Sequence, residues 1–579
     1  MRGAPPSSDS SDPQTALDRG LEDLAHCAPS WPRVAVEERR RLLAAVRREV
    51  AACAADWARA GCDAKGLSAD GPQAAEEWLA GPVQVLRNLR LLEQTLARVA
   101  AGRDPVDAGE LVQDGERVRV PVVPNDLQER VMLPGMSAEV WCGGAAAPEG
   151  GLDPGRVARD AAWIYRERPA EPGICGVLGA GNVSSIGPMD CLTKLFVEGR
   201  SVLLKHHPVN AYLEPIFARA LRPLIERGFL RQVTGGAEVG QALVHDERVA
   251  DLHITGSGAV HDAIVWGTGA EQAERRAAGD PLISKPISSE LGCVTPILIV
   301  PGAWSAQDLR RVARSVATMV ANNASFNCNS AKLLVTSEAW EQRFAFLEEL
   351  RRALAAIPTR LAYYPGAHER HERYCEAAHE PGTGNLERLG KPAPGHLPWA
   401  LATGLDPNRA DRTPFQDEPW CAVLGEVVLP EVGPDFAQAA VEFANEQVFG
   451  TLCAGLWVHP DTEAADPGVT ERMLRALRYG DIAVNEWPGL AYGLVAPSWG
   501  AYPGHTLADV GSGRGVVHNT CALDHVEKSV VRAPFRPPIT PIWNSFHRRG
   551  LPAARGLTRY EAKPGWLRLA ALGVSAYRP

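Results

Sequence analysis

The chain has 579 residues, of which 45% are hydrophobic and 22% charged, and this composition is ordinary for a globular enzyme. Its length exceeds what one hydrophobic core usually serves, so we expect two large lobes. The formal net charge of −9 lacks the basic excess of nucleic-acid-binding proteins, so we expect no nucleic-acid partner. No run of 18 apolar residues occurs, and we expect no membrane span.

The first residues are rich in Ser, Pro and Asp and lack the apolar stretch of a signal peptide. We therefore predict a disordered tail over residues 1–29. The twelve cysteines are scattered and form no CxxC pair. Without a secretion signal, they are predicted to be reduced thiols. These features favour a cytoplasmic protein.

Residues 35–102 carry apolar side chains at three- and four-residue spacing between charges, which predicts helices. A polar stretch rich in Gly and Pro follows, from about 102 to 155. We expect the segments near 110–165 and after 530 to form arms. The Pro- and Arg-rich tail after residue 531 is expected to wrap the surface or a neighbouring subunit.

From residue 172 onward, short apolar runs alternate with helical stretches. Strands are predicted at GICGVLGA, SVLLKHHP, VADLHITGSG, CVTPILIVPG, AKLLVTS, LGEVVLP, LCAGLWVHP and GDIAVNEW. Ser305 is the expected N-cap of a helix that begins at Ala306. Such alternation implies parallel sheets covered on both faces. The predicted fold class is α/β, with two doubly wound parallel-sheet lobes and a small oligomerisation arm.

Cys328 lies between a predicted helix and a predicted strand, at a sheet edge where side chains face a crevice. A cysteine there can reach a bound carbonyl, although a buried structural cysteine is the more common outcome for this residue type. Glu290 precedes a strongly apolar strand. Burial there would raise its pKa toward that of a general base.

Three further motifs contain groups that bind ligands. GVLGAGNVSSIGP combines glycines, among them Gly179, with Asn182, whose amide can hold a developing oxyanion. Lys205 ends a predicted strand, where a cation can meet a ribose or phosphate. The turn with Gly256 and Ser257 offers free backbone N–H groups near a helix start. Each motif alone also fits an ordinary turn or a solvated strand end.

Taken together and in this order, the motifs resemble the aldehyde dehydrogenase superfamily over about residues 172–531. The nucleophile of the family corresponds to Cys328. The other matches are Asn182 in GAGNVSS, Lys205 in LLKHHP, the turn ITGS at 254–257, the base motif SELGC at 289–293, EPWCA at 418–422, and the late Val-Asn pair at 484–485.

The resemblance implies an oxidoreductase that uses NAD or NADP. Cys328 would attack the aldehyde, Asn182 would stabilise the oxyanion, and Glu290 would activate the water that releases the acid. The implied cofactor-binding residues are Gly179, Lys205, Gly256, Ser257, Leu291, Glu418 and Trp420. No metal ligand is expected, because the His- and Glu-rich segment 367–380 fits a charged helix.

The resemblance also implies the organisation of the chain. The cofactor lobe would span residues 30–290, including the helical region and the arm segment at about 110–165. The catalytic lobe would span 291–500. Residues 501–579 would return to the cofactor lobe and form a C-terminal arm. A homodimer or homotetramer is expected, with an aldehyde as the small-molecule partner.

Departures from the family leave two questions open. Ser325 and Phe326 stand where a Gly-Gln pair is usual, and Cys293 replaces a glycine, so the substrate cannot be inherited. Pro208 occupies the position of a glutamate that many NAD-preferring members have, so the choice between NAD and NADP stays open. GSGRG at 511–515 is expected to be a flexible loop near the substrate. Trp499 and Tyr502 are candidates for the substrate pocket.

Two alternative functions remain. A CoA-acylating aldehyde dehydrogenase, or acyl-CoA reductase, would share the fold and the nucleophile, but acylating relatives generally lack the glutamate base, so Glu290 favours hydrolysis. A non-catalytic scaffold or binding protein that kept the fold is the second alternative. The joint presence of Cys328, Glu290, Asn182 and Glu418 favours an enzyme.

Overall fold

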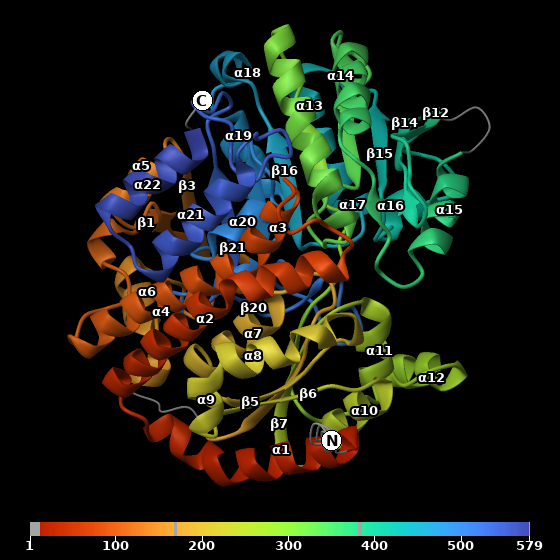
Figure 1. The fold of residues 1–579 in the computed structure, drawn as a ribbon. Coiled ribbons are helices and arrows are strands. Elements are labelled where there is room, and N and C mark those ends of the chain that lie inside the picture. Colours follow the sequence, from red (N-terminus) through yellow and green to blue (C-terminus); the bar gives the residue numbers. More distant parts are fainter. Residues whose placement is uncertain (1–11, 167–170, 380–384, 578–579) are drawn as a thin grey trace, which may run out of the picture.

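The computed structural model describes residues 12–166, 171–379 and 385–577. Two sheets dominate the fold, one in each of two lobes, which lie one above the other in Figure 1. Helices cover both sheets, as the alternation of strands and helices predicted, and the α/β fold class is confirmed.

The six-stranded sheet belongs to the lower lobe in Figure 1. Five of its strands are parallel and the short sixth strand is antiparallel. In spatial order they are β19 (Gly513–Arg514), β8 (Ile287–Glu290), β7 (Val249–Thr255), β4 (Ile174–Leu178), β5 (Ser201–Lys205) and β6 (Leu230–Val233). Its helices are α7 (Ile186–Phe196), α8 (Glu214–Ala220), α9 (Arg222–Glu226), α10 (Ala237–His245), α11 (Gly258–Trp266) and α12 (Ala270–Ala278).

The eleven-stranded sheet runs through the upper lobe and is parallel from β21 to β14. In spatial order its strands are β1 (Val112–Asp114), β2 (Arg117–Val123), β3 (Ser137–Gly143), β21 (Val526–Arg532), β17 (Asp481–Val484), β16 (Cys453–Trp457), β9 (Pro296–Ile299), β10 (Leu333–Ser337), β15 (Val423–Leu429), β14 (Trp399–Leu405) and β12 (Asn385–Leu389). Its principal helices are α13 (Ala306–Ala321), α14 (Arg343–Ala356), α15 (Ala367–Ala378), α17 (Gly433–Gln447) and α20 (Gly489–Leu494).

We predicted that the arm segment at 110–165 belongs to the cofactor lobe at 30–290. In the structure, its strands do not join the six-stranded sheet of that lobe. Its strands β1 to β3 extend the larger sheet, because β3 pairs antiparallel with β21, which in turn pairs with β17. In β2, Val118 and Val120 are buried and alternate with partly exposed arginines, the pattern of a half-buried antiparallel strand. The abundance of Gly and Pro nearby concealed this pattern.

The prediction of disorder over residues 1–29 is wrong for the part that the structure describes. Residues 13–27 form helix α1 (Pro13–Cys27), which buries Leu17, Leu21 and Leu24 against the six-stranded sheet and α10. These leucines recur at three- and four-residue spacing, so one face of the helix is apolar. Residues 1–11 lie outside the described part of the chain.

The helical region predicted at 35–102 is confirmed by α2 (Val36–Ala64), α3 (Ala74–Trp78) and α4 (Gln84–Ala100). The predicted N-cap is also confirmed: the hydroxyl of Ser305 accepts from the Asp308 backbone N–H, and the Asp308 carboxylate accepts from Ser305. The C-terminal tail instead contains two helices that were not predicted, α21 (Gly550–Ala562) and α22 (Trp566–Tyr577). They contact α3, α4 and α5 (Leu127–Met132).

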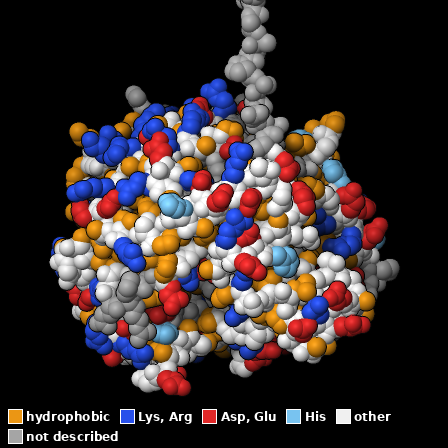
Figure 2. Space-filling model, turned by 90° about the horizontal axis from the view of Figure 1, so that it is seen from below, with side chains coloured by type: hydrophobic (Ala, Val, Ile, Leu, Met, Phe, Trp, Pro, Cys, Tyr) orange, Lys and Arg blue, Asp and Glu red, His pale blue; other side chains and the backbone are white. Residues whose placement is uncertain are grey.

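All twelve cysteines carry free thiols in the structure. Among the described residues, no helix is both long and apolar enough to cross a membrane. On the face seen in Figure 2, acidic and basic side chains are interspersed with hydrophobic ones.

Candidate active site

Cys328 and Glu290 come together where the two sheets approach each other. Glu290 is the last residue of β8, and Cys328 lies between helix α13 and strand β10. The Cys328 thiol donates a hydrogen bond to Glu290 Oε1 over 3.2 Å. The two residues predicted as nucleophile and base therefore form a direct pair.

The loop before Cys328 has a strained backbone. Asn323, Ala324 and Ser325 have φ values of 51°, 56° and 69°, a region that non-glycine residues seldom adopt. Such conformations persist only where surrounding contacts enforce them, and they cluster at functional sites. Here the Asn323 N–H donates to Glu76 over 2.9 Å, and the Tyr363 hydroxyl donates to Asn323 Oδ1 over 3.0 Å.

Burial controls the acidity of the pair. Glu290 is 3% exposed, and desolvation raises its pKa to about 7 while the Trp499 indole opposes the rise. Desolvation and then the Glu290 carboxylate raise the pKa of the Cys328 thiol well above its ordinary value, and Lys332 opposes them. The resting pair therefore holds a neutral thiol whose proton points at a carboxylate that titrates near neutral pH.

Asn182 is buried and contacts the backbone two residues before Cys328. Its Nδ2 donates to the carbonyl oxygen of Phe326 over 3.0 Å. Its own backbone carbonyl accepts from Lys65 Nζ and from the Tyr363 hydroxyl, each over 3.2 Å. The backbone N–H of Cys328 makes no hydrogen bond within the described residues. The Asn182 amide therefore contacts the loop at Phe326, and the backbone N–H of Cys328, two residues later, has no partner in the described part of the chain.

Sequence reasoning did not identify Lys65, Asn323 and Tyr363 as part of this site. Lys65 ends helix α2 and Tyr363 follows the short strand β11 (Arg360–Leu361). Their contacts with Asn182 span 117 and 181 residues of sequence. No local pattern marks such partners, because only the fold brings them to the Asn182 carbonyl.

Lys332 links the nucleophile loop to Glu418. Its buried ammonium donates to the carbonyls of Cys293, Asn327 and Cys328, each over 2.9 Å. It also lies 2.9 Å from Glu418 Oε1. In the sequence it stands out only as the nearest basic residue after Cys328. In the structure it neutralises Glu418 and holds the loop.

Gly292, which precedes Cys293, lies against the Glu418 carboxylate. A Cβ at Gly292 would overlap the Glu418 side chain. Desolvation raises the pKa of Glu418, and the Lys332 ammonium opposes the rise. The Leu-Gly pair of the base motif therefore makes room for Glu418 beside strand β8.

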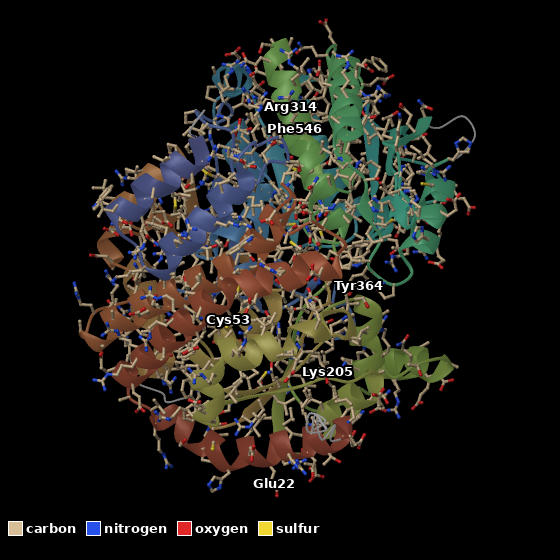
Figure 3. The ribbon with its side chains drawn as sticks, viewed as in Figure 1. Glu22, Cys53, Lys205, Arg314, Tyr364 and Phe546 are labelled. Atoms are coloured by element: carbon tan, nitrogen blue, oxygen red, sulfur yellow. The ribbon has the colours of Figure 1, made fainter. Side chains whose placement is uncertain are left out.

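Lys205 and Gly179 lie together at the carboxyl ends of neighbouring parallel strands. The Gly179 N–H donates to the Lys205 carbonyl over 3.0 Å. The Lys205 ammonium has no hydrogen-bond or ion-pair partner in the part of the chain that is described. Burial lowers its pKa and Glu238 opposes this. Figure 3 shows Lys205 in the lower lobe, beneath Tyr364 at the junction of the lobes.

Ser257 is the N-cap of helix α11, and its hydroxyl accepts from the Val260 N–H over 3.3 Å. A Cβ placed at the neighbouring Gly258 would meet no atom within 4 Å, so the start of this helix is open. The first N–H groups of a helix attract anions. This terminus can therefore hold a phosphate, and Gly256 leads into it.

The remaining cofactor candidates lie on both sides of the junction. Leu291 has a buried side chain, and its N–H donates to the Ser512 carbonyl over 2.8 Å, so its backbone has a structural partner. Trp420 has a φ of 47° and packs edge-on against Tyr364, with ring centroids 5.6 Å apart. Tyr364 also contacts His207, next to the Lys205 strand end.

The segment GSGRG at 511–515 was expected to be a flexible loop. In the structure, part of it forms a strand that pairs with β8. Gly513 and Arg514 form β19, which pairs with Glu290 and Ser289. Gly513 has a φ of 124°, and a Cβ there would overlap the Ser289 carbonyl. The hydroxyl of Ser512 donates to the Gly292 carbonyl over 2.8 Å. This strand holds the base in register.

A cavity of about 690 Å³ approaches the Cys328 loop, although Cys328, Glu290 and Asn182 do not themselves line it. Val183, Asn327 and Asn329, the neighbours of Asn182 and Cys328, belong to its lining. The predicted pocket residues Trp499 and Tyr502 do not line it. Trp499 is buried against Tyr492, and Tyr502 bonds to Glu527.

Within the described residues, no group of three His, Cys, Asp or Glu side chains is placed to hold a metal ion. The helix expected at 367–380 is present as α15 (Ala367–Ala378). In it the buried His371 contacts the Pro398 carbonyl, with 3.1 Å between nitrogen and oxygen. This histidine therefore has a structural role.

Residues 141–363 match the model of the aldehyde dehydrogenase family. No curated protein sequence matches the chain. Among solved structures, an indole-3-acetaldehyde dehydrogenase complexed with NAD+ is 19% identical, with a TM-score of 0.60, over 90% of this chain and 89% of that one.

Two further structures are similar over most of their length. The gamma-glutamyl-gamma-aminobutyraldehyde dehydrogenase of Burkholderia cenocepacia is 18% identical, with a TM-score of 0.60, over 89% of this chain and 88% of that one. The glyceraldehyde-3-phosphate dehydrogenase of Methanocaldococcus jannaschii, complexed with NADP, is 15% identical, with a TM-score of 0.59, over 90% and 95%. The family model thus matches part of this chain, and the solved structures show that the chain shares their fold.

Proposed function

We propose that this protein oxidises an aldehyde to a carboxylic acid with NAD+ or NADP+. The observation that carries the proposal is the contact between the Cys328 thiol and the Glu290 carboxylate at the junction of the lobes. A nucleophile with a base in hydrogen-bond reach is the arrangement that covalent catalysis requires. Structures of similar fold in complex with NAD+ and NADP support the choice of cofactor.

The first chemical step uses the pair directly. Glu290 takes the thiol proton, and the Cys328 sulfur forms a bond to the aldehyde carbon, so the carbonyl oxygen gains negative charge. The Asn182 amide, which contacts the Phe326 carbonyl two residues before Cys328, and the free Cys328 N–H would stabilise that oxyanion. One such donor typically contributes about 3 kcal/mol to transition-state stabilisation.

The second stage breaks the carbon–hydrogen bond. As the oxyanion collapses, a hydride leaves the substrate carbon and a thioester to Cys328 remains. A nicotinamide cofactor, once held by the residues at the junction of the lobes, would supply the oxidising chemistry as the hydride acceptor. Glu290 releases the thiol proton to solvent and then removes a proton from water, whose oxygen attacks the thioester. The carbon–sulfur bond breaks, the acid leaves, and the Cys328 thiolate takes the proton back from Glu290.

Residues on both lobes fit a dinucleotide. Lys205 offers an ammonium without a partner at a strand end, and the open start of α11 at Ser257 suits a phosphate. Glu418, held by Lys332, offers a carboxylate to a ribose hydroxyl. Gly179 and Gly256 leave space for close approach of the cofactor, and Leu291 and Trp420 flank the same junction.

The nucleophile is tested by replacing Cys328 with Ala and measuring aldehyde-dependent formation of NADH or NADPH. We expect no detectable turnover, whereas Cys521→Ala, which changes another partly exposed cysteine, should retain full activity. The assay is run without CoA, and the acid is identified by mass spectrometry. Unchanged turnover of Cys328→Ala, or a strict requirement for CoA, would contradict the proposal.

The resemblance to the family also leads us to propose a homodimer or homotetramer and a cytoplasmic location. Light scattering coupled to gel filtration gives the mass in solution directly. A mass near that of a single 62.2 kDa chain at micromolar concentration would argue against the oligomer.

A further inference from the structure

The cavity that reaches Asn327 and Asn329 has more space than the aldehyde group of a substrate would occupy. Its volume of about 690 Å³ falls in the range of pockets that enclose whole drug-sized ligands, about 300 to 1,000 Å³. It reaches from Asn327 and Asn329, on either side of the nucleophile, to helix α22 near the C-terminus. The space therefore extends away from the reacting atoms toward a separate wall.

The C-terminal helices build the far side of this cavity. Trp566, Leu569, Leu572 and Gly573 of α22 line it, and so does Leu557 of α21. Opposite them lie residues of α3, α5 and α20 and of the segment 537–547. These elements are far apart in the sequence and meet only around this space.

Buried ion pairs hold the helices in place. Glu561 of α21 is fully buried and accepts from Arg90 Nε over 2.6 Å and from an Arg87 nitrogen over 3.1 Å. Arg87 also bonds to Glu129 of α5 and to the Leu494 carbonyl at the end of α20. One network thus ties α4, α5, α20 and α21 together beneath the cavity, so the wall is a fixed part of the fold.

The lining of the cavity is mainly apolar, and its charges have partners. Leucine, proline, alanine, isoleucine, valine, methionine and aromatic side chains make up most of the wall. Arg87 pairs with Glu561, and Arg360 pairs with Glu76 through two contacts of 3.0 Å. Neither arginine therefore offers a free cation to a carboxylate or phosphate on the substrate.

Glu486 is the remaining acidic residue in the lining. Its Oε1 accepts from the Trp487 N–H over 2.9 Å and from the Trp543 indole over 3.3 Å. It is 7% exposed, and desolvation raises its pKa to about 7. Because its charge is disfavoured at neutral pH, it is a weak counter-ion for a cationic substrate.

We propose that the substrate is an aldehyde with a long or bulky apolar tail, which lies in this cavity against α21 and α22. The inference rests on the proposed function, because it places the aldehyde carbon at Cys328. Transfer of the tail from water into the apolar lining provides binding energy in proportion to the apolar area that is buried. Small aldehydes would leave most of the cavity empty and lose that energy.

The first experiment is a homologous series of linear aldehydes from propanal to dodecanal with the full-length protein. We expect kcat/KM to rise about fourfold with each added methylene until the cavity is filled. An ω-amino aldehyde of matched length is included. A flat profile, or a preference for the amino aldehyde, would overturn the inference. A complete lack of oxidation of every aldehyde would instead contradict the proposed function.

The second experiment narrows the far end of the cavity. Gly573 lines it, and a Cβ there would meet no atom within 4 Å, so Gly573→Phe places a ring in the space without a clash at the backbone. We expect the ratio of kcat/KM for dodecanal to that for propanal to fall at least tenfold. Val574→Phe is the matched control, because Val574 is 56% exposed and outside the lining.

Thermal unfolding of both variants shows whether α22 remains folded. If both are folded, a Gly573→Phe ratio equal to that of Val574→Phe would overturn the placement of the tail. If Gly573→Phe is unstable, Ala570→Leu, which enlarges a smaller lining side chain on the same helix, tests the same point. A reduced ratio in either stable variant would support the inference.

Discussion

The proposed cofactor site and the proposed substrate cavity are built in different ways. Lys205, Gly256, Ser257 and Glu290 lie at or just after the ends of strands β5, β7 and β8 of one sheet, in which β7 and β8 are neighbours and β4 separates β7 from β5. The substrate cavity instead combines α3, α5, α20, the segment 537–547 and the C-terminal helices. One side is set by strand ends in one sheet, the other by segments that are far apart in the sequence.

This difference separates the reaction from the choice of substrate. Parallel strands deliver their carboxyl ends to one edge of a sheet, so short motifs there always meet. A wall assembled from distant helices depends on their packing and can change without altering the strand ends. We therefore expect changes on the two sides to affect different steps, and the following experiments test that separation.

The largest effect is expected from Glu290→Gln. Removing a positioned general base typically slows a reaction by a factor of about 100 to 10,000, and we expect kcat to fall about a thousandfold. One equivalent of NADH or NADPH per site should still form slowly. Turnover should then stop, because the thioester is not hydrolysed. Single-turnover and steady-state kinetics measure both phases. Glu271→Gln on the exposed face of α12 is the control, and steady-state turnover of Glu290→Gln within tenfold of normal would refute the base assignment.

The substrate side is tested by Glu561→Ala, which leaves Arg87 and Arg90 buried without their shared partner. Loss of one member of a buried ion pair costs about 3 to 5 kcal/mol, so we expect the free energy of unfolding to drop by about 3 kcal/mol. Chemical denaturation measures it. Asp56→Ala breaks the exposed pair with Arg219 and should cost less than about 1 kcal/mol. Equal losses would show that the network does not anchor α21.

The pH dependence of turnover reports on the burial of Glu290. Its pKa is raised to about 7, and only the deprotonated carboxylate can act as a base. We therefore expect kcat to rise with pH, with an apparent pKa about 7, and to fall about tenfold per pH unit below it. In Glu290→Gln this rise of kcat with pH should disappear. The pKa of Glu486 is also raised to about 7. If the rise persists in Glu290→Gln, it comes from another group such as Glu486, and its assignment to Glu290 is wrong.

The smallest effect is expected at the adenosine end of the cofactor. Glu238 at the start of α10 interacts with Lys205 and would repel a 2′-phosphate bound there. Glu238→Gln should raise the ratio of kcat/KM for NADP+ to that for NAD+ several-fold, because one negative charge is removed. Glu247→Gln, an exposed change away from Lys205, is the matched control. An unchanged ratio would show that Glu238 does not select the cofactor.

The predictions from sequence succeeded where the determining contacts are local. The helix at 306–321 has its cap and its apolar face within one short segment, and both were predictable. The strands that end in Lys205 and Thr255 were predicted from their apolar runs, whereas the short strand β8, which ends in Glu290, was not predicted. Helix α1 was missed although its leucines are regularly spaced, because the polar residues before it dominated the composition.

Other features had no local signal. The arm strands β1 to β3 join the larger sheet only because β21, several hundred residues later, pairs with β3. GSGRG looks like a flexible loop by composition. It becomes a strand because Ser289 and Glu290 offer it a backbone partner. Polar residues and glycines permit several conformations, and long-range pairing selects one of them.

The sequence by itself determined the chemistry of this protein: a thiol, a carboxylate, an amide and a lysine at strand and helix ends, in the order of the aldehyde dehydrogenase superfamily. The tertiary structure decided that Cys328 Sγ and Glu290 Oε1 lie 3.2 Å apart and that the C-terminal helices line an apolar cavity that reaches the neighbours of Cys328. The reason is physical. Side-chain type and strand-end position are properties of short segments, whereas desolvation and cavity shape depend on everything that packs around them.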